Sequence, residues 1–205
     1  MENPSPHRGS SRDAIVAAAE ILFLKRGFDG VSMDDLAEEA GVARRTLYNQ
    51  FASKEDILRE MLLRLSRQIG SALPPGIETQ GDVEDVLRLM ARAVMAFQAP
   101  LEFVGLVRMA VADARQFPWI ASEFASVLGP HIERFARYLS CLTSLDILDC
   151  PVPLLAAHQF LGLLNEPILW QRVLGRDVVP VSPETVIEEA ARMFLLRYRP
   201  TQPSQ

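Results

Sequence analysis

The sequence has few of the residues that build disulfide scaffolds or metal sites. It contains two cysteines and three histidines in 205 residues. Cys141 and Cys150 provide no disulfide framework and fit a reducing compartment, with a redox switch between them as the alternative to two idle thiols. The histidines, at positions 7, 131 and 158, show neither metal-ligand spacing nor an acidic cluster nearby. We therefore expect no metal and no cofactor.

Long apolar runs are also missing. Hydrophobic residues make up 49% of the chain, yet charged residues interrupt every apolar run before it could cross a bilayer. The first residues are polar and lack the apolar stretch of a signal peptide, so residues 1–9 are predicted to be a disordered arm and residues 201–205 a tail. The sequence predicts a cytoplasmic protein with no membrane partner.

Catalytic signatures are weak. Ser126 with His131, or Cys141 with His158, could pair as nucleophile and base, but no nucleophile elbow or oxyanion motif accompanies either pair. We expect that the protein is not an enzyme, with a small helical enzyme as the rival class.

Residues 32–51 instead predict two short helices joined by a tight turn. Ser32 and Asp35 have the spacing of a capping box, and Gly41 is suited to the left-handed conformation that ends a helix. Val42 and Leu47 can fold back on the first of these helices to close a small core. This is the pattern of a helix-turn-helix, whose second helix enters the major groove of DNA.

The outward side chains of that second helix fit the chemistry of DNA. Arginine can bond guanine through two donors, asparagine or glutamine can bond adenine, and hydroxyls can hold phosphates. An ordinary solvated helix face is the alternative interpretation. The net charge of −5 argues against a broadly basic DNA binder, but residues 42–54 hold three positive side chains and no acid. We therefore predict binding through the placement of these residues: Ser32, Arg44, Arg45, Thr46, Tyr48, Asn49 and Lys54.

The same region resembles the N-terminal domain of TetR-type bacterial transcriptional regulators. The match runs over residues 11–63 and rests on residues 17–23, 27–28, 32–37, 40–42, 46–48, 51 and 53–55. The resemblance implies that Thr46, Tyr48 and Lys54 touch operator phosphates while Arg44, Arg45 and Asn49 face bases. Gln50 stands where the family often carries a histidine.

Apolar periodicity predicts an all-α fold of about nine helices, with no strand pattern. We expect a three-helix DNA-binding domain with its helix-turn-helix within residues 10–73, and an effector-binding and dimerisation domain at 77–200. Pro74 and Pro75 mark the boundary. Further helices are predicted at 82–98, 101–115, 118–142, 152–174 and 183–199.

The C-terminal part is rich in aromatic residues, which can form a solid core or enclose a ligand cavity. A weaker resemblance, from Phe103 to Leu163, to the effector domain of AefR-like members of the family implies a pocket for a small, largely apolar effector. Pro167 predicts a kink after Asn165 and Glu166. The candidate pocket residues are Phe97, Phe103, Val107, Trp119, Phe124, His131, Phe135, Asn165 and Trp170.

The last two helices have more apolar residues than one buried face requires, which predicts contact with a second subunit. Two such hairpins form a four-helix interface. The predicted interface residues are Leu155, Phe160, Leu163, Ile187, Ala190 and Phe194. The sequence thus predicts a homodimeric repressor that leaves a palindromic, double-stranded DNA operator when a small-molecule effector binds. The alternative is an activator, or a ligand-independent DNA-binding regulator with a filled C-terminal core.

Overall fold

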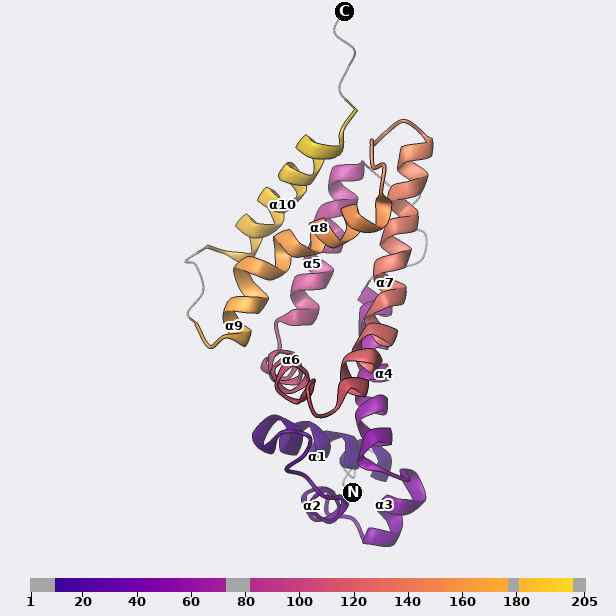
Figure 1. Cartoon of the computed structure of the whole chain (residues 1–205), viewed down its shortest axis with the longest axis vertical. Coiled ribbons are helices and arrows are strands. Elements are labelled where there is room, and N and C mark those ends of the chain that lie inside the picture. Colours follow the sequence, from indigo (N-terminus) through magenta and orange to yellow (C-terminus); the bar gives the residue numbers. More distant parts are fainter. Residues whose placement is uncertain (1–9, 73–81, 177–180, 201–205) are drawn as a thin grey trace, which may run out of the picture.

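The computed structural model describes residues 10–72, 82–176 and 181–200, and these residues are helical, without strands (Figure 1). The predicted arm, tail and domain boundary lie outside the described residues. α8, the π-helix η2 and α9 follow one another without a break, so the described chain contains nine helical rods, as predicted. The elements are α1 (Ser11–Arg26), α2 (Met33–Glu39), α3 (Arg44–Gln50), α4 (Lys54–Ala72), α5 (Val83–Gln98), α6 (Leu101–Asp113), α7 (Pro118–Ser144), α8 (Pro153–Asn165), η2 (Glu166–Trp170), α9 (Gln171–Val173) and α10 (Pro183–Tyr198).

Side-chain caps fix where the first helices begin and end. Ser10 and Ser32 each form a complete capping box, with Asp13 and Asp35 respectively, and the predicted helix start at Ser32 is confirmed. Gly41 has φ 63°, and the amide of Val42 donates to the carbonyl of Ala37 at 3.0 Å. The left-handed Gly41 and this hydrogen bond belong to a Schellman motif, which turns the chain sharply from α2 into α3.

The N-terminal helices enclose one hydrophobic core, which also receives side chains from α6 and α7. Leu36 and Leu47 are fully buried in it, and Ala40 and Val42 pack against its edge, as the helix-turn-helix prediction requires. We call α1 to α3 with the first turns of α4 the N-terminal unit. Figure 1 shows it at one end of an elongated molecule, with α4 running out of it along α7.

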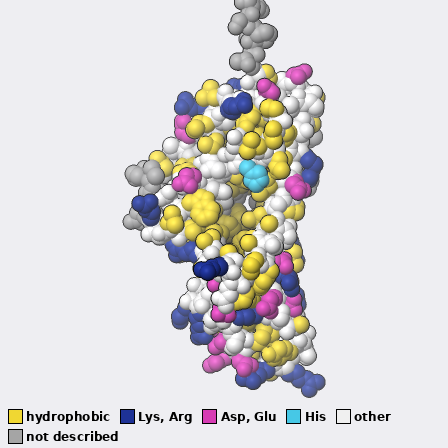
Figure 2. Space-filling view, in the orientation of Figure 1, with side chains coloured by type: hydrophobic (Ala, Val, Ile, Leu, Met, Phe, Trp, Pro, Cys, Tyr) yellow, Lys and Arg dark blue, Asp and Glu magenta, His cyan; other side chains and the backbone are white. Residues whose placement is uncertain are grey.

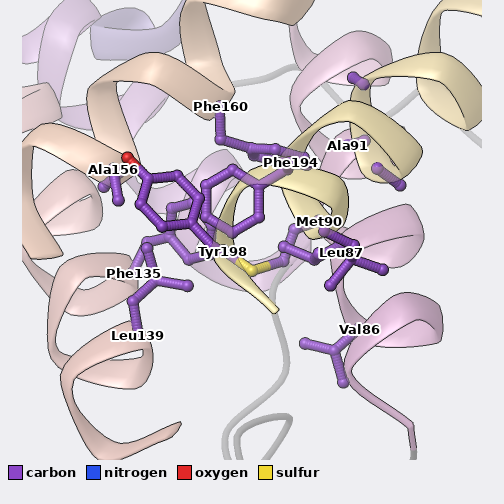
Figure 3. Close-up of a cluster of buried hydrophobic side chains, with 14 of the residues drawn as sticks. Val86, Leu87, Met90, Ala91, Phe135, Leu139, Ala156, Phe160, Phe194 and Tyr198 are labelled. Carbon is purple, nitrogen blue, oxygen red and sulfur yellow. The ribbon is translucent and has the colours of Figure 1, made fainter. Parts of the chain in front are cut away.

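A second core lies between α5, α7, α8 and α10, which with α6, η2 and α9 make up the C-terminal unit. Aromatic rings run through this core in sequence (Figure 3). Phe160 lies 5.4 Å from Phe135 and 5.3 Å from Phe194, and Phe194 lies 4.7 Å from Tyr198, measured between ring centroids. Such offset and edge contacts stabilise a core beyond the area they bury.

The helix after α8 changes type at the predicted kink. Pro167 has no backbone N–H, so the regular hydrogen-bond ladder cannot continue through it. The chain forms the five-residue π-helix η2 at this point, and a regular α-helix follows as α9. Among the described residues no single helix is long and apolar enough to cross a membrane, and α5 and α6 reach that length only as a pair bent by 77°.

Candidate DNA-binding surface and ligand cavity

The outer face of α3 presents most of the predicted DNA-contacting side chains to solvent. Arg44, Arg45, Tyr48 and Asn49 are exposed and Thr46 is half-buried, while Leu47 anchors the helix in the core. Lysine and arginine side chains gather with acidic ones at this end of the molecule (Figure 2). The face therefore combines guanidinium, hydroxyl and amide groups at the spacing of a single helix.

Acidic residues of α2 bind two of the side chains that are predicted to contact DNA. Arg44 pairs with Asp34 at 2.6 Å, although both side chains are at least half exposed. Ser32 is exposed, but its hydroxyl and backbone amide donate to the Asp35 carboxylate, and these bonds hold the pKa of that carboxyl below its usual range. Ser32 thus has a capping role in addition to its predicted place beside DNA.

Lys54 has a structural role that the sequence did not indicate. Its Nζ donates to the carbonyl oxygens of Phe28 at 2.9 Å, Val31 at 3.1 Å and Asp29 at 3.5 Å. The ammonium also lies 4.5 Å from the centroid of the Phe28 ring. The first turn of α4 is therefore tied to the loop between α1 and α2, and the phosphate contact of Lys54 stays a prediction.

Arg12 of α1 fixes the far end of α3. Its guanidinium donates to the carbonyl of Gln50 at 3.0 Å and to Glu60 at 2.9 Å, and stacks 4.2 Å from the ring of Phe51. A cation at the C-terminal carbonyls of a helix is favourable. No local sequence spacing points to Arg12, because its partners are far along the chain.

The C-terminal unit encloses a cavity of about 430 Å³ between α4, α5, α6, α7, α8 and η2. In Figure 2, hydrophobic side chains surround a recess midway along the molecule. Apolar side chains dominate its wall, as is usual for sites that bind small molecules. Its lining includes eight of the nine predicted pocket residues, namely Phe97, Phe103, Val107, Phe124, His131, Phe135, Asn165 and Trp170.

The assignment of Trp119 to this pocket is wrong. Trp119 lies in the first turn of α7 and packs against the N-terminal core, with its ring 5.3 Å from that of Phe28. The Arg59 guanidinium lies 5.7 Å from its centroid. Because α7 begins at the junction of the two units, its first turn meets α1 and α4, and the cavity wall starts only at Ala121.

Polar groups enter the cavity wall at three positions. His131 bonds the Ser66 hydroxyl of α4 at 3.0 Å, and burial, with Arg134 nearby, lowers its pKa below the ordinary 6.5. Gln98 at the end of α5 donates to Asn165 at 2.9 Å. The sequence analysis did not identify Gln98 as a pocket residue. Its position directly after Phe97, where an apolar helical stripe ends, is a weak signal of a buried polar group.

Two helices connect the cavity wall to the N-terminal unit. On α6, the Asp113 carboxylate accepts the amide of Phe28 at 3.0 Å, three residues after the cavity-lining Ala110. On α7, Glu123 accepts from Arg59 of α4 at 2.8 Å, next to the cavity-lining Phe124. Side chains that a ligand would touch are therefore within one helical turn of contacts to the DNA-binding helices.

Part of the predicted dimer interface is wrong. Phe160, Ile187 and Phe194 are at most 2% exposed inside the core of one subunit, so they offer a partner almost no surface. Ala190 is also 2% exposed, but it lines a shallow groove with Leu163. The apolar surplus of these helices fills the subunit core first. The exposed apolar residues that remain on α8 and α10 are Leu154, Leu155, Met193 and Leu196.

No group of three or more histidine, cysteine or acidic side chains in residues 10–72, 82–176 and 181–200 could hold a metal ion.

Both units match known regulators. Residues 15–61 match the bacterial regulatory proteins of the tetR family, and residues 85–200 match the C-terminal domain of AefR-like transcriptional repressors. The chain is 40% identical over 181 residues to the HTH-type transcriptional regulator EthR of Mycobacterium tuberculosis, covering 86% of this chain and 81% of that protein.

Solved structures show the same architecture. The flavonoid-responsive regulator FrrA superposes with a TM-score of 0.76 at 30% identity, over 95% of this chain and all of that one. A TetR-family regulator from Mesorhizobium loti superposes with a TM-score of 0.78 at 23% identity, over 95% and 100% of the two chains. Together with the exposed α3 face and the two-unit fold, these matches show that the chain is a DNA-binding transcriptional regulator of the TetR family, with an AefR-like C-terminal domain.

Proposed function

We propose that the chain is a homodimeric repressor that leaves a palindromic operator when a small, largely apolar effector enters the cavity. The observation that carries this proposal is the cavity itself, which is lined by the same helices, α6 and α7, that contact the N-terminal unit. A filled C-terminal core, as a ligand-independent regulator would have, would leave no such space.

Similar proteins support the parts of this proposal. The C-terminal match is to transcriptional repressors, which favours repression over activation. FrrA is described as flavonoid-responsive, which supports a small and flat organic effector for a cavity with aromatic walls. We infer the response to an effector from the cavity and the direction of regulation from the C-terminal match.

The second subunit would cover the exposed apolar side chains of α8 and α10. Leu155 is 52% exposed and Met193 is 52% exposed, and Met193 lines an apolar groove with Leu163 and Ala190. Exposed apolar groups on two adjacent helices favour a two-fold contact between identical faces. A two-fold dimer places its two α3 helices in successive major grooves, roughly 34–36 Å apart, or at multiples of a turn.

Effector release then follows from subunit geometry. An occupant of the cavity pushes on α6 and α7, and Asp113 and Glu123 pass the displacement to the N-terminal unit. The effector need only favour a spacing of the α3 helices that does not match the operator. Because the coupling is reciprocal, operator DNA weakens effector binding by the same factor.

The test begins with footprinting on the DNA upstream of the gene, where we expect two protected half-sites related by a two-fold axis. Neutral apolar compounds that raise the melting temperature are then titrated against that DNA. Release by the compounds that stabilise the protein supports the proposal. Equal operator affinity with and without every stabilising compound would contradict it.

The dimer is tested by Leu155→Glu, which places a charge on the proposed contact. Sedimentation should show monomers and much weaker operator binding. Leu63→Glu on α4 is the matched control, because Leu63 is 50% exposed and lies away from α8 and α10. Dimers of the Leu155→Glu protein would place the interface elsewhere.

A further inference from the structure

One polar atom in the cavity wall has no partner. Gln98 is only 8% exposed, and its Nε2 donates to Asn165 Oδ1 at 2.9 Å. Its Oε1 is buried and accepts no hydrogen bond, the one such side-chain nitrogen or oxygen in the described parts of the chain. Buried polar atoms in folded proteins nearly always have partners, because an unpaired acceptor loses its hydration without replacement. Gln98 Oε1 is therefore a vacant acceptor at a ligand site.

The surrounding contacts hold this amide in the cavity wall. Arg172 donates to the backbone carbonyl of Gln98 at 2.9 Å and to that of Ala99 at 2.8 Å, which fixes the end of α5. Asn165 is the last residue of α8, immediately before the π-helix that Pro167 imposes. The two amides thus join two helix ends, and Gln98 cannot turn outward without breaking its bond to Asn165.

The rest of the wall sets the charge of an occupant. The cavity lining contains no Lys, Arg, Asp or Glu side chain, so a buried carboxylate, phosphate or ammonium would have no counter-charge. His131 supplies none at neutral pH, because burial lowers its pKa and it already bonds Ser66. The wall therefore favours a neutral, mostly apolar molecule.

We propose that Gln98 Oε1 determines the specificity of the cavity by accepting a hydrogen bond from a hydroxyl or N–H group of a neutral, otherwise apolar effector. This inference rests on the proposed role of the cavity as the effector site, and names the class of molecule that it selects. The opposite amide arrangement, with Asn165 donating to Gln98, would instead present an N–H and select an acceptor. The two arrangements make opposite predictions.

Three probes of one shape separate these cases: 4-phenylphenol carries a donor, 4-methoxybiphenyl carries only an acceptor, and biphenyl carries neither. Dissociation constants are measured by tryptophan fluorescence, with Trp170 in the cavity wall as the reporter. We expect 4-phenylphenol to bind about ten-fold more tightly than either of the others, since the analogue without a donor leaves a buried acceptor unpaired.

Gln98→Met tests the residue directly, because methionine keeps an unbranched side chain of similar length without an amide. This variant should bind all three probes within about two-fold of one another, as an apolar wall does not distinguish them by hydrogen bonding. Gln116→Met is the matched control, since Gln116 is exposed and does not line the cavity. It should keep the preference for 4-phenylphenol. Circular dichroism and melting temperature of both variants establish that they fold.

Each other outcome overturns the proposal. A preference of the unmodified protein for 4-methoxybiphenyl would assign the opposite amide arrangement, and equal affinities for all three probes would remove Gln98 from selection. Binding of none of them would show that the cavity does not accept such molecules. Failure of the proposed function gives a different result: 4-phenylphenol would bind with the expected preference, yet leave operator affinity unchanged.

Discussion

The two units of this regulator bury their apolar side chains in different ways. In the N-terminal unit, Leu36, Leu47 and Ile57 are completely buried, and side-chain caps stabilise the first turns of α1 and α2. The C-terminal unit has an aromatic core of comparable burial, but beside it the helices leave a cavity of about 430 Å³. The N-terminal unit has a filled core, whereas the C-terminal unit has a filled core with a cavity beside it.

This difference matches the two tasks that the proposed function assigns to the units. A DNA-reading helix must be held rigidly, because its side chains have to meet base edges at fixed positions. A ligand-responsive unit needs two arrangements of similar free energy, which a cavity supplies when it is either empty or occupied. Under the proposed function, contacts such as Asp113 to Phe28 would let the C-terminal unit move the N-terminal unit as a body.

The largest expected effect compares one substitution in each unit. Leu47→Ala removes a fully buried side chain and should lower the free energy of unfolding by about 2–5 kcal/mol, with loss of operator binding. Leu161→Ala, in the cavity wall, should cost less than about 2 kcal/mol, since that side chain already borders empty space. Urea denaturation at one protein concentration measures both. Equal losses would break the distinction between the units.

Arg44→Ala tests whether the exposed α3 face reads bases. If Arg44 contacts a guanine, the substitution should cost about 1–3 kcal/mol per half-site and relax one base position of the operator. Arg137→Ala is the control: Arg137 is 69% exposed against 71% for Arg44 and also pairs with an acid, but it lies on α7. A loss that is the same for every DNA sequence would assign Arg44 to phosphates.

Lys54→Met separates a structural role from a phosphate contact. Losing the donor to three carbonyls should lower the melting temperature and the operator affinity, with a cost of about 1–3 kcal/mol for the carbonyls left without their partner. If Lys54 acts only on these carbonyls, the slope of log affinity against log salt does not change. A slope smaller by about one, with an unchanged melting temperature, would show that Lys54 acts on a phosphate.

The smallest effect concerns pH and the cavity wall. The pKa of His131 is depressed in the folded protein, so between that value and about 6.5 the unfolded chain binds more protons than the folded one. Acidification through this window should therefore lower stability, by less than about 1.4 kcal/mol per pH unit, because the group is only partly buried. His131→Gln should flatten the pH dependence of the melting temperature. His158→Gln, exposed on α8, should leave it unchanged.

Local rules predicted the N-terminal unit well. The capping box at Ser32 and the left-handed Gly41 depend on residues only a few positions apart, so the sequence displays them directly. Contacts between distant residues were not visible in this way. Arg12, Lys54 and Asp113 bond atoms that no spacing rule connects to them.

For the C-terminal unit, the sequence could not locate every apolar side chain. Aromatic content left a solid core and a cavity both open, and the resemblance to AefR-like proteins implied the pocket. Eight of its nine candidate residues line the cavity, but periodicity could not assign Trp119 to the other core. Likewise, the surplus of apolar residues on the last helices did not reveal that Phe160 and Phe194 stack on each other inside one subunit. Which of two surfaces an apolar side chain meets depends on tertiary packing, and a single sequence carries little information about it.

The Arg44–Asp34 ion pair bears on how the protein searches a chromosome. If Arg44 reads a guanine, DNA without a guanine at that position offers it only phosphates in exchange for its carboxylate, an exchange of one ion pair for another. A matched guanine would add two directed hydrogen bonds. The net charge of −5 further weakens attachment to arbitrary sequence. Weak attachment to arbitrary sequence would leave more of the protein free to occupy its operator.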